Sequence, residues 1–361
     1  MTRFLCCGVA FSVLVLPLGG CSGRVKEDVE KPSSGLNVKL GKVPALSLAA
    51  RQPITEAKSK EIKGMIAGLA ALDRPDFGLS ATLSGNAFSP VPGQGRADTM
   101  LLTDHGLQPS DSLKQLVALG PDALPFLLDA LDDQTPTKIT IEHGGGIGIM
   151  RQASELHLNP VNPAEEAVYK AREKSPAREE EEKEHITSYT VKVGDVCFVA
   201  IGQIVGRSYQ AVRYQPTACI MLNSPVHDSK LCAEVRAIWK SKEPRRKLFE
   251  ALLADYATEG VFNGRSLDGW DCGNQFQCGA ALRLLYYFPN EASALIARRL
   301  DNLAVGKDAD LDSFMHRCVA NGVRVNEFLK AVAWCKTPAV RAALGRLFKR
   351  AGNMDSLQEA P

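Results

Sequence analysis

The feature that most constrains the fold is a pair of short apolar helical stripes that meet at a Gly-Pro break, in the stretch "LVALGPDALPFLLDALDD". Four leucines there recur at i, i+3, i+4 and i+7, the spacing of one helix face: Leu124, Leu127, Leu128 and Leu131. Gly120 and Pro121 are typical of the end of one helix and the start of the next. Residues 112–133 are therefore predicted to form two antiparallel helices. Neither can bury its stripe alone, so neighbouring helices are required.

Later segments supply such neighbours. Residues 243–257 carry apolar side chains at helical spacing, and residues 279–303 repeat the plan of two helices around a Pro-Asn turn. Residues 337–352 open with Thr-Pro, which suits a helix start, and reach Gly352, which is expected to end the helix. The chain is thus predicted to be mainly α, as an irregular α-solenoid or a helical bundle.

Two of these stretches carry a family resemblance. "LVALGPDALPFLLDALDD" and "TPAVRAALGRLFKRA" resemble HEAT-type repeats, in which two antiparallel helices each bear an apolar stripe and an Arg often follows a Val, here Val340-Arg341. The resemblance implies stacked helix pairs. Because the spacing is irregular, unlike the ~40–47 residues of regular arrays, an irregular HEAT-like α-solenoid is expected.

An insertion interrupts the helices at about residues 136–190. Residues 137–159 alternate apolar and polar positions around a run of glycines, which predicts a small β-hairpin. Residues 159–185 are charge-rich and contain prolines, so we expect a surface helix or a mobile insertion there. Residues 213–228 show no clear period and are predicted to be an irregular crossing loop.

The N-terminus predicts export. Arg3 precedes an apolar run over residues 4–18, which is shorter than the ~20 residues of a spanning helix and fits a signal peptide. "LGGC", ending at Cys21, resembles the bacterial lipobox. That resemblance implies cleavage before Cys21, a lipid on its sulfur and, with Ser22 next, the periplasmic face of the outer membrane of the bacterial cell envelope. An ordinary secretory signal cut elsewhere is the alternative.

These features give a domain plan. Residues 1–20 are the lipoprotein signal peptide and residues 21–53, which mix charge, Gly, Ser and Pro, are expected to be a flexible tether. Residues 54–352 form the HEAT-like helical domain, and residues 353–361 form a C-terminal tail. The membrane is a predicted partner, reached through the N-terminal lipid. No nucleic-acid partner is expected, because the net charge of +2 is too small to indicate one.

Residues 260–274 form the candidate ligand site. "FNGRSLDGW" resembles an opening motif of the 3-keto-disaccharide hydrolase domain family, which implies an envelope β-sandwich acting on carbohydrate, but a segment of helical period follows it here. The other interpretation is a Gly-rich loop whose tryptophan packs on the next helix pair. The candidate ligand-binding residues are Asn263, Asp268, Trp270, Asp271 and Asn274.

Among ten cysteines, Cys272 and Cys278 are the candidate disulfide.

Sequence motifs for catalysis are lacking. The chain has no His-Glu-x-x-His, no Cys-x-x-Cys and no Gly-x-Ser-x-Gly, so no metal site, cofactor or catalytic residue is predicted. The expected function is a membrane-tethered scaffold or interaction lipoprotein that binds a partner protein of unknown identity. The alternative is an envelope enzyme or binding protein that acts on carbohydrate through residues 260–274.

Overall fold

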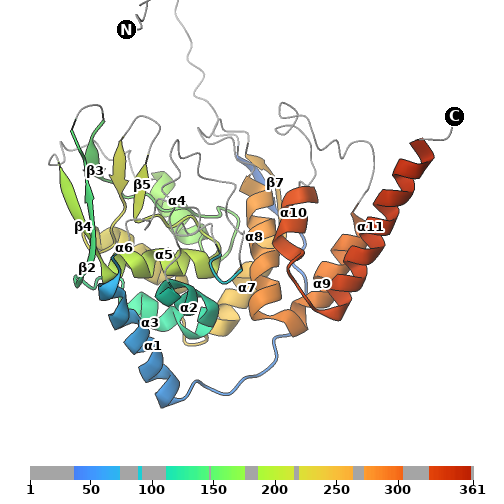
Figure 1. Ribbon diagram of the computed structural model, residues 1–361, viewed down its shortest axis with the longest axis horizontal. Helices are drawn as coiled ribbons and strands as arrows, with labels where there is room; N and C mark the ends of the chain where they lie inside the picture. Colours follow the sequence, from blue (N-terminus) through green and yellow to red (C-terminus); the bar gives the residue numbers. More distant parts are fainter. Residues whose placement is uncertain are drawn as a thin grey trace, which may run out of the picture. The chain divides into compact units, whose positions relative to one another are not determined.

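The computed structural model shows a mainly α protein (Figure 1). It describes residues 36–73, 88–91, 111–145, 148–174, 186–214, 219–262, 272–303 and 325–358. All of these belong to one compact unit, Leu36–Pro361. The helices are α1 (Glu56–Gly68), α2 (Asp111–Leu119), α3 (Leu124–Asp129), α4 (Glu166–Lys174), α5 (Val193–Val205), α6 (Ser229–Trp239), α7 (Pro244–Tyr256), α8 (Cys272–Tyr287), α9 (Pro289–Asn302), α10 (Val325–Val332) and α11 (Pro338–Gln358).

Helix α5 forms the centre of the first group of helices. All of its 13 residues are buried, as expected for a helix that is apolar on every side. Helices α1, α2 and α3 pack against it, so the two stripes around the Gly-Pro break are buried on α5. A Cβ on Gly194 would lie 2.4 Å from the Leu131 carbonyl oxygen. The start of α5 therefore approaches the end of the α3 segment more closely than a side chain would allow.

The helices after α6 pack against one another. Helix α7 contacts α8, α8 contacts α9 and α10, and α9 contacts α11 along its length (Figure 1). The predicted helices at residues 243–257 and around Pro289 are confirmed. The predicted end at Gly352 is wrong, because α11 continues to Gln358. A single glycine weakens a helix by only ~1 kcal/mol and need not end it.

The strands correct the prediction for the insertion. Strand β2 (Pro136–Glu142) pairs antiparallel with β4 (Ser188–Lys192), and β3 (Met150–Gln152) pairs in parallel with β6 (Ile220–Leu222), which also pairs with β5 (Val212–Tyr214). The predicted β-hairpin is therefore wrong, and so is the irregular loop at residues 213–228. Parallel strands need a long connection between them, which leaves no local signal in the sequence.

The tether prediction is also corrected in part. Leu36–Leu40 forms strand β1, which pairs antiparallel with β7 (Thr258–Phe262). The following residues stay on the protein surface, where Leu46 and Leu48 pack against the core. Arg51 forms an ion pair of 2.9 Å with Asp122. The C-terminal part of the predicted tether thus belongs to the fold, whereas residues 21–35 lie outside the described residues.

None of the helices that the structure describes is both long and apolar enough to span a bilayer.

The chain is tightly packed at Gly120, in the Gly-Pro break. Its φ is +54°, and a Cβ there would lie 2.3 Å from Cε1 of Tyr287, whose hydroxyl donates a 2.6 Å hydrogen bond to the Val117 carbonyl. Gly120→Ala is expected to lower the free energy of unfolding by about 2–4 kcal/mol, from backbone strain and overlap.

Urea denaturation measures this change. Gly345→Ala on α11 is the control, because a Cβ there meets nothing within 4 Å and alanine favours the helix. A Gly120→Ala protein as stable as Gly345→Ala would contradict the described packing of this turn.

Candidate functional site

Most of the predicted site residues fall outside the description. Residues 263–271 are not described, and they include Asn263, Asp268, Trp270 and Asp271. Asn274 lies in the first turn of α8, without a described side chain. Cys21 also lies outside the described residues. What the structure does describe is the framework on both sides of this loop, where β7 ends and α8 begins.

A buried polar cluster underlies both ends of the loop. We call it the Arg207 cluster; its members are Asn159, Asn162, Glu165, Arg207, Asp255 and Thr258, all with at most 1% exposure. They come from the segment before α4, the end of α5, the end of α7 and the start of β7. The sequence pattern had placed three of them in a surface insertion.

Arg207 joins two carboxylates. Its Nε and Nη2 donate to Glu165, with Nη2 2.6 Å from Oε2. Its Nη1 and Nη2 donate to Asp255 at 2.7 and 2.8 Å. Nη1 also donates to the Gly206 carbonyl at 3.0 Å. Both edges of the planar guanidinium are therefore paired with carboxylates in fork geometry, which is the strongest arrangement for such pairs.

Asparagine side chains complete the pairing. Nδ2 of Asn159 and Nδ2 of Asn162 donate to Oδ1 of Asp255 at 2.8 and 2.7 Å. The backbone N–H of Asn159 donates to Glu165, and its Nδ2 also reaches Thr258 Oγ1 at 2.9 Å. Each asparagine also accepts from the N–H two residues ahead, which forms an Asx turn. The two turns direct this segment into the core.

Local structure explains why Arg207 points inward. Helix α5 ends at Gly206, whose φ of +77° is the left-handed conformation common just after a helix. The chain therefore reverses direction at once, and Arg207 follows with no exposed surface. Asp255 lies in the last turn of α7, where its carboxylate meets this guanidinium.

Aromatic contacts extend the cluster to the start of α8. The Arg207 guanidinium lies 4.9 Å from the ring centroid of Phe276, and the His157 ring stacks on Phe276 at 5.4 Å. Gln277 Nε2 donates to the Thr258 carbonyl. The residues on either side of the undescribed loop are therefore fixed to one another and to the Arg207 cluster.

Charge in this region is balanced within the core. Burial would lower the pKa of Arg207, but Asp255 and Glu165 outweigh burial and raise it. A second buried cation, Arg283, donates to the carbonyls of Gln203 and Gly279, and burial lowers its pKa to about 10. Arg207 is thus paired with both carboxylates, as buried charges require, whereas Arg283 donates to backbone carbonyls.

His157 is unsuited to acid–base chemistry at neutral pH. It is half-buried, and its burial together with the Arg207 charge lowers its pKa to about 3. Its Nδ1 accepts a hydrogen bond from the Ser208 N–H at 3.2 Å. A neutral imidazole that is engaged in this way helps to hold the segment in place. The members of the Arg207 cluster are buried and paired with one another, and this pairing stabilises the framework.

A second buried cluster surrounds Asp195. Its carboxylate accepts from the Tyr189 and Ser224 hydroxyls, both at 2.6 Å, and from the Lys192 N–H. Burial raises the pKa of Asp195 despite these bonds. Ser224 donates to a carboxylate and not to an imidazole, so this is not the geometry of an activated nucleophile. Asp195 ties β4, α5 and the turn after β6 together.

The candidate disulfide involves two positions on one helix. Cys272 begins α8 and Cys278 lies six residues further along it. Six residues of helix rise about 9 Å, which exceeds the ~7 Å Cα separation that a disulfide tolerates. A bridge would require the first turn of α8 to unwind, and the pairing stays a prediction.

A metal centre or a known relative would each help to identify the site. Among the described residues, no group of three or more His, Cys, Asp or Glu side chains is arranged to hold a metal ion. Comparison of the chain with protein families, curated proteins and solved structures gives no match.

Arg207 carries the first prediction for this region. Arg207→Met leaves two buried carboxylates without a counter-charge, so the free energy of unfolding should fall by about 3–5 kcal/mol. The control is Arg213→Met, which breaks a half-exposed ion pair with Glu155 and should cost less than ~1 kcal/mol. Urea denaturation followed by circular dichroism measures both. Equal losses in the two variants would contradict the central role of the cluster.

His157 carries a pH prediction. Its pKa of about 3 in the folded state lies below the unfolded value of 6.5, so only the unfolded chain gains a proton between these values. Stability is therefore lost as pH falls below 6.5, by about 2 kcal/mol from this group between pH 7 and pH 5.

The variant His157→Asn keeps an acceptor for the Ser208 N–H but does not titrate in this range. Urea denaturation at pH 7, 6 and 5 should show a shallower loss of stability in His157→Asn than in the wild type. Parallel curves for the two proteins would show that the imidazole remains accessible to protons.

Proposed function

We propose that the protein is a lipid-anchored scaffold of the bacterial cell envelope that binds a partner protein and performs no catalysis. The observation that carries this proposal is the closed state of the Arg207 cluster. The largest set of buried ionisable groups among the described residues has its carboxylates and guanidinium paired with one another, away from solvent. Such groups hold helices together, which leaves the outer helical surface as the means of recognition.

The finer architecture belongs to the same proposal. Helix α7 packs on α8, α8 packs on α9 and α10, and α9 packs on α11, and these stacked helices support an irregular HEAT-like α-solenoid. Each helix pair in such an array contacts mainly its neighbours, and the array exposes an extended surface that suits protein partners. This step from fold to function is an analogy between architectures.

The N-terminal sequence supports the anchor. A positively charged start, an apolar run of signal-peptide length and small residues before Cys21 together resemble a lipobox. Ser22, directly after Cys21, supports a location at the periplasmic face of the outer membrane. Fourteen residues lie between Cys21 and Leu36, where the described fold begins.

One observation favours a second candidate, a carbohydrate-binding or carbohydrate-acting loop at residues 260–274. Thr258 and Gln277, on either side of the loop, are hydrogen-bonded to each other, and Thr258 also belongs to the Arg207 cluster. Binding sites are commonly carried by loops whose ends a rigid framework holds. Trp270, Asp271 and Asn274 would then supply a stacking surface and polar groups.

A pull-down from detergent-solubilised envelope tests the two candidates. The baits are the lipidated wild type, Cys21→Ala and Trp270→Ala, and mass spectrometry identifies both bound proteins and bound glycans. The scaffold proposal predicts a reproducible protein partner that Trp270→Ala retains, because that residue lies in the loop and not on the helices.

Two results would contradict the proposal. Recovery of glycan in place of protein, lost in Trp270→Ala, would favour the carbohydrate candidate. A Cys21→Ala protein that remains in the membrane fraction would refute the lipid anchor, because the anchor requires the Cys21 sulfur. A wild type with no diacylglycerol mass on its N-terminal peptide would refute it as well.

A further inference from the structure

The exposed side of α11 is unlike the rest of the described surface. Of the large apolar side chains that are exposed among the described residues, Phe348 is the most exposed, at 61%. The opposite side of α11 is buried through Val340, Ala343 and Leu347, and α11 packs on α9 (Figure 1). Phe348 therefore points away from α9, the helix against which α11 is extensively packed.

Charge around Phe348 is strongly positive. Residues 325–358, from the start of α10 to the end of α11, contain six basic residues and two acidic residues, although the whole chain has a net charge of only +2. Arg346 pairs with Asp301 at 2.8 Å. Arg341 and Lys349 are exposed and make no ion pair with any described residue. Within the part of the chain that the structure describes, Arg341 and Lys349 on the same helix as Phe348 are thus cations without an acidic partner.

These residues share one side of the helix. Arg341, Gly345 and Phe348 are spaced i, i+4 and i+7, so they follow one another along a single face, and Lys349 adjoins it. A Cβ on Gly345 would meet no atom within 4 Å, so the surface between Arg341 and Phe348 is open. We call Arg341, Gly345, Phe348 and Lys349 the α11 surface.

We propose that the α11 surface docks on an anionic phospholipid leaflet and holds the helical domain against the membrane. A basic helix face with an exposed aromatic ring is the chemistry of interfacial membrane binding, in which the ring enters the headgroup region and the cations attract anionic lipid. The residues beside the ring are small or charged. They offer no packed apolar centre of the kind that dominates a protein interface.

This inference rests on the proposed lipid anchor. The fourteen residues between Cys21 and Leu36 can extend at most ~50 Å. An anchored domain is therefore confined near the leaflet, and this confinement raises the effective concentration of lipid at the α11 surface. A contact that is weak on its own then suffices for docking.

Fluorescence quenching tests the docking. The full lipidated chain is reconstituted into vesicles of phosphatidylcholine alone or with one third phosphatidylglycerol, both containing dibrominated phosphatidylcholine. Phe348→Trp reports contact, as quenching in excess of that of the wild-type tryptophans. We expect at least twofold more excess quenching in the anionic vesicles, and a loss of that difference at 500 mM salt, because salt screens the attraction.

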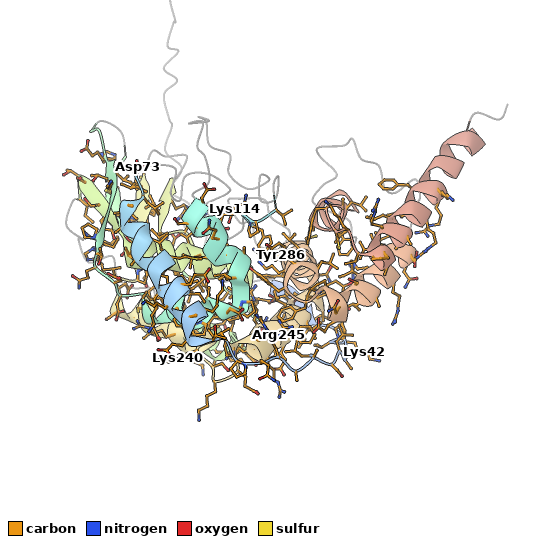
Figure 2. All side chains as sticks on the ribbon, turned by 60° about the horizontal axis from the view of Figure 1, so that its bottom comes forward. Lys42, Asp73, Lys114, Lys240, Arg245 and Tyr286 are labelled. Carbon is orange, nitrogen blue, oxygen red and sulfur yellow. The ribbon has the colours of Figure 1, made fainter. Side chains whose placement is uncertain are left out.

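Charge reversal supplies the matched comparison. Arg341→Glu with Lys349→Glu, added to Phe348→Trp, should abolish the excess quenching. Lys60→Glu with Lys114→Glu changes the net charge equally at exposed residues of α1 and α2 and should leave the quenching intact (Lys114 is labelled in Figure 2). Circular dichroism confirms that the variants fold.

The outcomes separate the two proposals. Excess quenching that is equal in both lipid compositions, or unaffected by the reversal on α11, would overturn the docking. The docking would also be overturned if an acidic protein, and no vesicle, covers the tryptophan of Phe348→Trp. If the purified chain carries no diacylglycerol, the anchor fails, and the docking is then measured with the unanchored chain at millimolar lipid. A charge-dependent signal there would support docking without the anchor, and no signal would overturn it.

Discussion

The burial of Arg207 between Glu165 and Asp255 is the constraint on which the described framework depends. Removing these charges from water costs several kcal/mol per ion, and only complete pairing offsets that cost. The pairing requires four segments to meet, namely residues 157–165, the end of α5, the end of α7 and the start of β7. The cluster therefore joins the helices around α5 to those that begin with α7.

The rest of the packing leaves the surface of the protein as the part that would recognise a partner in the proposed scaffold. Helix α5 is buried on every side, and the Asp195 cluster fixes its first turn to β4 and Ser224. Tyr287 on α8 bonds to the end of α2, which links the two helical groups a second time. With the buried polar groups committed in this way, the proposed scaffold would meet its surroundings through the helices α9 and α11 and through the loop at residues 260–274.

Local sequence patterns predicted the helices, whose formation depends on residues close together in the chain. Apolar spacing identified α7 and α9 because each buries one face of a single helix. It missed β5 and β6, which have three residues each and pair with distant strands. It also placed Asn159 and Glu165 on the surface, since their partners lie about 40 to 100 residues away. The repeated Asn-Pro pattern was a signal of two Asx turns, but not of their burial.

The most direct test is native-state hydrogen exchange of the amide of Glu165, which donates to the Asn162 carbonyl, compared with amides in α5 and α7. If the Arg207 cluster joins these segments, the amides should open with the same free energy, and Asp255→Asn should lower all of them together. Exchange at Glu165 that is much faster than in α5 and α7, and unchanged by Asp255→Asn, would show that residues 157–165 lie on the framework without supporting it.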